Sequence, residues 1–226
     1  WTAELELEVP QEGMTINYSY QIEQNGIVIR KEWDSFSRSI FLSGSSRKIY
    51  RINDCWKNIP EQLYLYSSAF TEALLAHPEK ENIPQRYKKG LVIKAYAPRI
   101  NKDYCLAICG NQKSLGHWDP EKAVLMSDTN FPEWQIELDA SKLKYPLEYK
   151  FILYNKQEKK ADCWEKNPNR YLADSELKTN ETLVISDRYV YFDIPAWKGA
   201  GIAIPVFSLK SEKSFGVGDF GDLKRM

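Results

Sequence analysis

Short segments of apolar, β-branched and aromatic residues, separated by turn residues, fill the second half of the chain. The segments with the length of a β-strand are residues 91–97, 104–109, 135–138, 147–154 and 183–192. About 100 residues of short strands between turn signals are typical of an immunoglobulin-like sandwich. We therefore predict an all-β fold for this half, an antiparallel β-sandwich of immunoglobulin-like architecture.

Residues 1–53 show the same kind of pattern. Residues 2–9 alternate between apolar and polar side chains, which predicts a half-buried strand. Further strands are expected at residues 18–22, 27–30, 38–42 and 48–53, and Asn25-Gly26 is a strong signal for a tight hairpin turn. An antiparallel sandwich is again the expected architecture.

The two halves share aromatic and charged residues in the same order. Trp1 and Trp33 are 32 residues apart, and Trp134 and Trp164 are 30 apart. An internal repeat on this scale indicates two tandem copies of one module. The first copy then lacks its front, and we expect the natural chain to extend upstream by about the 43 residues that separate Leu91 from Trp134 in the second copy. The other matching pieces are Asn17-Tyr18-Ser19-Tyr20 with Glu148-Tyr149-Lys150-Phe151, Glu32-Trp33 with Trp164-Glu165, and Arg38 with Arg170.

Two tryptophans of the second copy stand beside turn residues. Trp118 precedes Asp119-Pro120, and Trp164 lies shortly before Asn167-Pro168-Asn169. Together with a strand lysine between them, they suit a glucose ring, because indole faces match its apolar C–H face and polar groups bind its hydroxyls. From the residues alone, each tryptophan fits a core position equally well. Lys150 and Glu148 equally fit an ordinary surface ion pair.

Three pieces of this stretch, in this order and spacing, resemble the starch-binding module of carbohydrate-binding family 20 over about residues 90–197. They are residues 115–119 (Leu-Gly-His-Trp-Asp), 148–151 (Glu-Tyr-Lys-Phe) and 164–170 (Trp-Glu-Lys-Asn-Pro-Asn-Arg). The resemblance implies that Trp118 and Trp164 stack against adjacent glucose units. It also implies that Lys150, Glu148 and Asn169 bind sugar hydroxyls.

Other sugar sites of that family are matched less well. Phe131 stands where a stacking tyrosine is usual, and a polar run at residues 101–103 replaces the tyrosine expected after the first strand. In the first copy, Ser19, Asn17 and Ser37 replace the polar sugar ligands, and only Trp33 remains. Phe131 and Trp33 are therefore possible second sites, and Trp33 fits the role of a half-buried packing tryptophan equally well. Trp134, where a strand enters the core, is expected to pack inside.

The remaining segments complete the domain prediction. Residues 57–89 read as a linker with a short helix at residues 67–75 that ends before Pro78. Residues 216–221 satisfy Gly-x-Gly-x-x-Gly, a weak signal for a dinucleotide phosphate. Residues 201–211 and 216–223 instead resemble the opening of glycoside hydrolase family 77, whose catalytic domain is a (β/α)8 barrel with its first strand at residues 202–207. The predicted domains are 1–56, the end of the first starch-binding module; 57–89, the linker; 90–197, the second module; and 198–226, the start of a catalytic domain.

Composition excludes several classes of partner. Lys plus Arg and Asp plus Glu are both 31, so no charge field favours nucleic acid or an anionic membrane. The longest apolar run, around residues 199–207, is too short to span a bilayer.

Four cysteines and two histidines form no metal pattern, and we expect no cofactor. Cys105 and Cys109 lie too far apart on one strand to bridge each other, since four residues span about 13 Å. Free buried cysteines and the absence of a visible signal peptide favour a cytoplasmic protein.

The combined resemblance implies a function. Two starch-binding modules ahead of a family 77 barrel resemble the disproportionating enzymes of that 4-α-glucanotransferase (amylomaltase) family. Such enzymes transfer α-1,4-glucan segments with two carboxylates and retention of configuration. The family places those carboxylates beyond residue 226, so this chain is expected to bind starch, glycogen or maltooligosaccharides without transforming them. The alternative is a non-catalytic scaffold or regulator associated with starch or glycogen.

Overall fold

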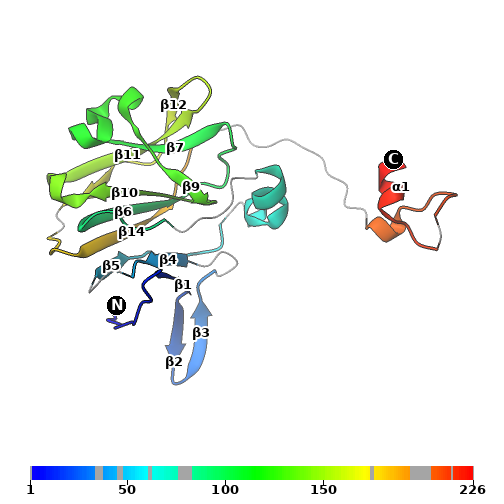
Figure 1. The fold of residues 1–226 in the computed structure, drawn as a ribbon, viewed down its shortest axis with the longest axis horizontal. Helices are drawn as coiled ribbons and strands as arrows, with labels where there is room; N and C mark the ends of the chain where they lie inside the picture. Colours follow the sequence, from blue (N-terminus) through cyan, green and yellow to red (C-terminus); the bar gives the residue numbers. More distant parts are fainter. Residues whose placement is uncertain are drawn as a thin grey trace. The chain divides into compact units, whose positions relative to one another are not determined.

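The computed structural model describes residues 2–33, 38–44, 48–60, 63–75, 83–173, 176–193, 205–214 and 216–225. The chain divides into two compact units, Trp1–Asp193 and Ile194–Met226. The first unit is built mainly of β-strands, which agrees with the predicted β-rich fold (Figure 1). Within the described ranges, no helix is long and apolar enough to cross a membrane.

One sheet of the first unit has five strands in the order β5-β14-β6-β10-β9. Its central strand β6 pairs antiparallel with β10, whereas β14 runs parallel to both β6 and β5, so the sandwich is not wholly antiparallel as predicted. Leu91, Ile93 and Trp134 on β6 and β10 are fully buried in the sandwich core. The five strands are β5 (Ile49–Asn53), β14 (Glu181–Tyr189), β6 (Lys89–Tyr96), β10 (Glu133–Asp139) and β9 (Ser127–Asn130).

The second sheet has the order β12-β11-β7-β8, with β13 also paired to β11. Leu106, Ile108 and Phe151 from β7 and β11 are 0% exposed and complete the core. Burying a side chain of this size stabilises the fold by about 1.5–3 kcal/mol. The two sheets lie as stacked layers (Figure 1), as in a β-sandwich. The strands are β12 (Lys160–Trp164), β11 (Leu147–Asn155), β7 (Tyr104–Gly110), β8 (Val124–Leu125) and β13 (Arg170–Leu172).

A third, smaller layer lies on the outer face of the first sheet. Strands β1 (Met14–Tyr18) and β4 (Arg38–Leu42) pair antiparallel. Ile40 and Leu42 of β4 form an apolar cluster with Val92 of β6 and Val184 of β14. This packing ties the N-terminal segment to the sandwich.

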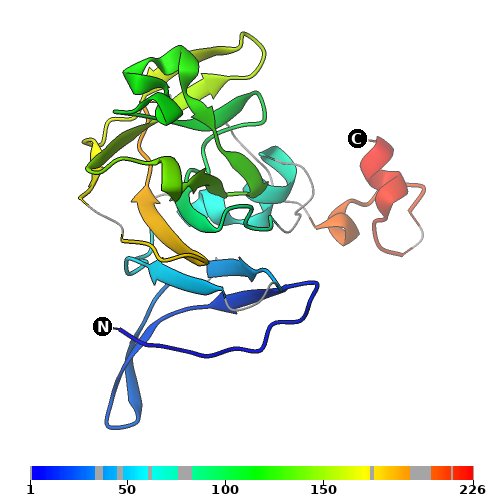
Figure 2. The same cartoon turned by 60° about the vertical axis from the view of Figure 1, so that its left-hand side comes forward.

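The hairpin of β2 (Gln21–Gln24) and β3 (Ile27–Lys31) extends away from the layers in both views (Figures 1 and 2). Asn25 and Gly26 have φ of 52° and 76°, the left-handed values of the tight turn that favours Asn-Gly. The predicted hairpin turn is thus confirmed. The predicted strand at residues 18–22 is two strands, because β1 ends at Tyr18 and β2 begins at Gln21.

The strand predicted at residues 2–9 is wrong. These residues form no strand, and residues 2–8 are exposed, with Leu5 at 82%. Alternation of apolar and polar residues produces a strand only where a neighbouring strand accepts its hydrogen bonds and an apolar layer covers one face. In the described part of the chain, no strand pairs with residues 2–8 and no apolar layer covers them.

The connection after β5 holds two short helices. They are η1 (Leu63–Tyr66) and η2 (Ala69–Leu74), a π-helix within the predicted helical stretch. Pro78, expected to end that helix, lies outside the described residues.

In the second unit, the 3-10 turn η6 (Val206–Ser208) occupies the end of the predicted barrel strand 202–207, so that strand is not formed at residues 206–207. Residues 202–204 lie outside the described part. The unit ends in helix α1 (Phe220–Arg225), where Asp222 N donates to Asp219 Oδ1 at 3.0 Å and Asp219 N donates to Asp222 Oδ2 at 3.0 Å. This reciprocal pair satisfies two free N–H groups of the helix start.

Candidate functional site

Two tryptophan rings come together on the outer face of the second sheet. The ring centroids of Trp118 and Trp164 are 6.1 Å apart, with an angle of 45° between the planes. Trp164 is 37% exposed and Trp118 is half-buried. The rings were predicted to converge at the surface, and they do. A tilted pair of indoles at this separation offers two apolar plates to one ligand.

A strained turn presents Trp118. Gly116, His117 and Trp118 have φ of 78°, 51° and 62°, all in the left-handed region. For a residue with a side chain, this conformation costs about 1–2 kcal/mol. A Cβ atom at Gly116 would lie 2.7 Å from the carbonyl oxygen of Lys122, so this position also requires glycine for space. Strain of this kind persists where the surroundings hold it, often at binding sites.

Hydrogen bonds from Asn111 and Gln112 hold the turn. Asn111 N donates to Glu148 O at 2.9 Å, and Asn111 Oδ1 accepts from Glu148 N at 3.2 Å. The Gln112 side chain bonds both the N–H and the carbonyl oxygen of Lys144 at 2.9 Å each. His117 N donates to Gln112 O at 3.0 Å. The roles of Asn111 and Gln112 were not predicted from sequence. Their place directly after a strand that ends in Gly110 is nevertheless a turn signal.

A buried ion pair between Glu165 and Arg170 holds the loop that follows Trp164. Glu165 is 2% exposed, accepts a hydrogen bond from Phe151 N at 2.8 Å and pairs with Arg170. The Arg170 guanidinium lies 4.4 Å from the ring centroid of Phe151. Burial raises the pKa of Glu165, and Arg170 opposes that shift. The pair closes the loop from Trp164, the last residue of β12, to Asn169.

Three polar side chains flank the indoles. Glu148 and Lys150 alternate with buried residues along β11 and face outward, half-buried. Asn169 Nδ2 donates to Glu148 Oε1 at 2.7 Å. Within the described residues, the ammonium group of Lys150 forms no hydrogen bond or ion pair. The surface ion pair between Lys150 and Glu148 that the sequence allowed is therefore not present. The site therefore combines two apolar plates with an ammonium donor, a carboxylate and an amide. Ligand hydroxyls can donate to the carboxylate and accept from the ammonium group.

The structure places Phe131 in the core and not at a sugar site. Its side chain is 5% exposed and meets Trp134 edge-on, with ring centroids 6.4 Å apart. A ring enclosed in this way has no free face for a sugar, so the stacking role considered for Phe131 is wrong. Trp134 is 0% exposed, as predicted, and its indole N–H donates to Ala97 O at 3.2 Å.

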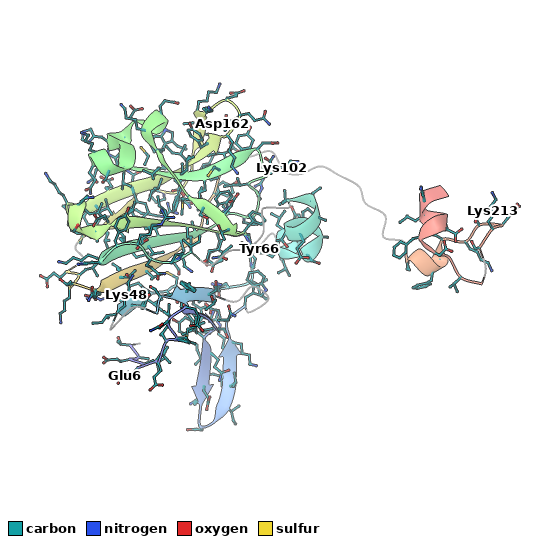
Figure 3. All side chains as sticks on the ribbon, viewed as in Figure 1. Glu6, Lys48, Tyr66, Lys102, Asp162 and Lys213 are labelled. Carbon is teal, nitrogen blue, oxygen red and sulfur yellow. The ribbon has the colours of Figure 1, made fainter. Side chains whose placement is uncertain are left out.

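The ring of Trp33 packs against another aromatic side chain. Its ring meets Tyr66, labelled in Figure 3, edge-on at 4.9 Å between centroids, and its backbone N–H donates to Lys57 O at 3.1 Å. Its half-buried position matches the packing role that the sequence left open.

The N-terminal layer repeats the architecture behind Trp164. Arg38 pairs with buried Glu32 as Arg170 pairs with Glu165. Opposite strand positions agree too: Tyr18 faces Arg38 as Tyr149 faces Arg170, and Gln21 faces Lys31 as Ile152 faces Trp164.

Lys31, which precedes Glu32, is therefore the structural counterpart of Trp164, which precedes Glu165. Trp33 corresponds to Lys166. The intervals between tryptophans, 32 and 30 residues, had predicted that Trp33 corresponds to Trp164. The register is fixed instead by the buried glutamate and arginine.

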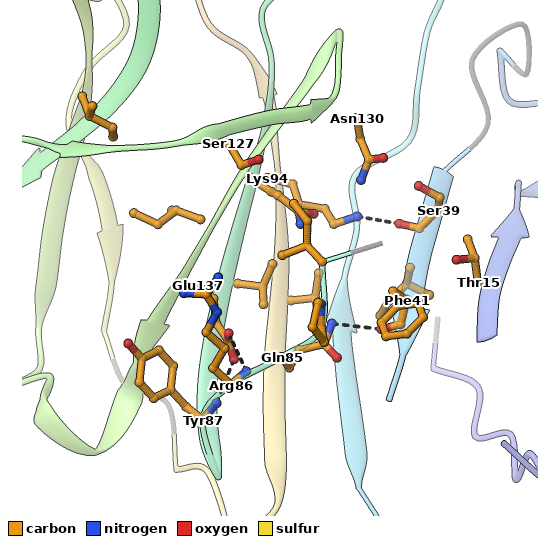
Figure 4. A pocket seen from close by; sticks show the side chains of 18 residues that line it. Thr15, Ser39, Phe41, Gln85, Arg86, Tyr87, Lys94, Ser127, Asn130 and Glu137 are labelled. Atoms are coloured by element: carbon orange, nitrogen blue, oxygen red, sulfur yellow. Dashed lines mark hydrogen bonds between the residues drawn. The ribbon is translucent and has the colours of Figure 1, made fainter. Parts of the chain in front are cut away.

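A cavity of about 240 Å³ lies elsewhere, between the β1–β4 layer and the first sheet (Figure 4). Lys94 crosses it, donating to Glu133 Oε1 at 2.8 Å and to Ser39 O at 2.5 Å. Thr15, Gln85 and Asn130 also line it, but none of the predicted sugar-contacting residues does. This cavity is therefore separate from the candidate site.

Comparison with known proteins identifies the domain that carries these residues. Residues 92–183 match the family model of the starch binding domain, so the chain holds a starch-binding domain of carbohydrate-binding family 20. The chain is also 26% identical over 231 residues to 4-alpha-glucanotransferase DPE2 of Oryza sativa subsp. japonica. That alignment covers 94% of the chain and 23% of the relative, so the chain spans about a quarter of the relative's length.

Solved structures with similar regions include two proteins. The family 20 module of maltotetraose-forming amylase from Pseudomonas saccharophila STB07 is 19% identical, with a TM-score of 0.35, over 43% of this chain and 99% of that chain. The family 15 glucoamylase from Hypocrea jecorina is 21% identical, with a TM-score of 0.38, over 46% of this chain and 17% of that chain.

Proposed function

We propose that this chain binds α-glucans, such as starch, glycogen and maltooligosaccharides, on the surface formed by Trp118 and Trp164. The observation that carries this proposal is the pair of indoles 6.1 Å apart, one exposed and one half-buried, on the same sheet as Lys150, Glu148 and Asn169. Each indole face can accept the apolar face of one glucose unit. The polar groups then replace water at the hydroxyls, so that little hydrogen bonding is lost on binding.

The test is a titration of the 226-residue chain with maltoheptaose or β-cyclodextrin, followed by tryptophan fluorescence. We expect Trp118→Ala and Trp164→Ala each to abolish most of the binding. The matched control is Trp33→Phe, which changes a half-buried tryptophan outside the site and should leave the affinity unchanged. A wild-type affinity retained in Trp118→Ala would contradict the proposal.

We further propose that the chain is the glucan-binding region of a 4-α-glucanotransferase of glycoside hydrolase family 77. This proposal is supported by the glucanotransferase relative, which aligns with 94% of the chain, and by the resemblance of residues 201–211 and 216–223 to the opening of that family's barrel. A binding surface linked to a catalytic domain raises the local concentration of glucan ends near that domain. The chain itself is expected to bind without catalysis. Incubation with maltotriose and chromatography of the products should show no transfer, and longer or shorter maltooligosaccharides would contradict this.

The N-terminal layer is, on this proposal, part of a second copy of the same module. Support comes from the repeated glutamate–arginine pair and the repeated strand register around it. With Lys31 in the place of Trp164 and Ser19 in the place of Lys150, this copy lacks two of the groups that bind sugar in the other. We therefore assign glucan binding to the second copy alone. Lys31→Ala should leave the affinity for maltoheptaose unchanged.

A further inference from the structure

Tyr171 is an exposed aromatic residue on β13, opposite Glu148, that the proposed site does not use. Its side chain is 66% exposed, more than that of Trp164. The neighbouring residues on β13 serve the fold, because Arg170 pairs with Glu165 and Leu172 lies opposite buried Leu147. Within the described residues, the Tyr171 side chain forms no hydrogen bond or ring contact.

The strand register puts Tyr171 on the same face as the sugar-binding groups. Tyr171 lies directly opposite Glu148 across the β11–β13 ladder, and directly opposite residues project from the same face of a sheet. Trp164 lies opposite Ile152 across the β11–β12 ladder. Lys150 lies between these two positions on β11. The two aromatic residues thus stand opposite the two ends of one row, positions 148, 150 and 152, on the same face of β11; of these three, Ile152 is covered and Glu148 and Lys150 are half-buried.

The length of this row exceeds what the indole pair covers. Positions 148 and 152 are four residues apart on β11, which corresponds to about 13 Å along a strand. The centroids of Trp118 and Trp164 are separated by 6.1 Å. A ligand that covers both indoles and continues along β11 passes Lys150, then Glu148 with its bonded Asn169, and reaches the ring of Tyr171.

We propose that Tyr171 forms an additional subsite for α-glucan, which contacts sugar units beyond the pair held by Trp118 and Trp164. This inference rests on the proposed glucan binding and adds a preference for chain length. The phenol ring offers one more apolar plate, and its hydroxyl can donate or accept a hydrogen bond. Maltose, with two glucose units, fills the indole pair and does not reach Tyr171. Maltoheptaose does.

The experiment measures the affinities of the chain for maltose and maltoheptaose by titration calorimetry. It compares the wild type with Tyr171→Ala, Tyr171→Phe and the control Tyr87→Ala. Tyr87 is a partly exposed tyrosine beside Glu137 on the other sheet, so its change should leave both affinities unaltered. Tyr171→Ala should weaken maltoheptaose binding about three- to tenfold, the range expected for one aromatic contact, and leave maltose binding unchanged. Tyr171→Phe should retain most of the maltoheptaose affinity.

Two results would overturn the subsite. One is an unchanged maltoheptaose affinity in Tyr171→Ala, and the other is an equal loss for maltose and maltoheptaose. Failure of the subsite can be told apart from failure of the proposed function. If Trp118→Ala abolishes binding while Tyr171→Ala has no effect, only the subsite is wrong. If the wild type binds neither sugar, glucan binding itself fails and the subsite falls with it.

Discussion

Asn169 hydrogen-bonds Glu148 across the outer face of the second sheet, and the loop that carries Asn169 is closed by the buried pair of Glu165 and Arg170. The position of this amide, which we propose binds sugar, therefore depends on an ion pair that faces the core. We expect stability and glucan affinity to be coupled at this loop.

Replacement of Arg170 by leucine should test that coupling. Glu165 would remain buried without its partner, and the loss of one member of a buried pair costs about 3–5 kcal/mol. Urea unfolding should show this destabilisation, and the affinity for maltoheptaose should fall because Asn169 is no longer held. The control is Lys160→Ala, which breaks the exposed pair with Glu158 and should change neither quantity measurably. Equal midpoints of unfolding for Arg170→Leu and wild type would contradict this account.

Gly116→Ala should disable the turn that presents Trp118. The new Cβ would meet Lys122 O at 2.7 Å in a left-handed conformation, so the turn must rearrange. We expect a loss of about 1–2 kcal/mol in stability and most of the glucan affinity. Gly26→Ala is the matched control, because Gly26 has φ of 76° but no atom within 4 Å of the added Cβ. It should cost stability alone. Retention of wild-type affinity by Gly116→Ala would show that the turn does not position the indole.

Lys150→Ala should weaken glucan binding without affecting the fold. The ammonium group forms no hydrogen bond or ion pair within the described residues, so its removal leaves no protein group there unsatisfied. A hydrogen bond from a charged group contributes about 1.5–3 kcal/mol, which predicts a loss of about tenfold or more in affinity for maltoheptaose. Lys102→Ala, in an exposed turn before β7, serves as the control. Thermal unfolding of both variants should match the wild type.

The stability of the first unit should rise with pH around Lys57. This residue is 9% exposed and its ammonium lies 4.6 Å from the ring centroid of Tyr96. Burial, together with the charge of Arg38, lowers the pKa of Lys57 from 10.5 to about 8. Between these values the unfolded chain holds the proton and the folded chain releases it, so folding is favoured as pH rises.

Unfolding by urea at pH 8 and pH 9.5 should detect this effect against Lys57→Met, which lacks the titrating group. Relative to that variant, the wild type should gain about 2 kcal/mol over this interval, at about 1.4 kcal/mol for each pH step of one. Parallel pH profiles for the two proteins would show that Lys57 does not titrate in this way.

Much of the sandwich could be predicted from sequence because its strands carry their own signal. Strands β6, β7, β10, β11 and β14 carry runs or alternations of apolar, β-branched and aromatic residues. Residues 2–9 carry an equally clear alternation and form no strand, since pairing depends on neighbours that a local pattern does not specify. Local periodicity identifies what can become a strand, and tertiary contacts decide whether it does.

The site was predictable in part for a similar reason. Tryptophans beside turn residues indicated Trp118 and Trp164, and the structure brings them together. Phe131 could not be placed by its residue type, because an aromatic residue next to a turn suits the core and the surface equally. The roles of the left-handed turn and of the amides of Asn111 and Gln112 arise from three-dimensional packing, so that the sequence offered only two weak signals for them, the turn residues after Gly110 and the glycine at 116.

The parallel pairing of β5 with β14 has a practical consequence for dissecting this protein. β5 covers the outer edge of β14, on the side opposite β6. A starch-binding domain trimmed to begin near β6 would expose the N–H and C=O groups of that edge to solvent. Bare edges of this kind recruit strands from other molecules. The trimmed domain should therefore self-associate at concentrations where the longer chain stays dispersed.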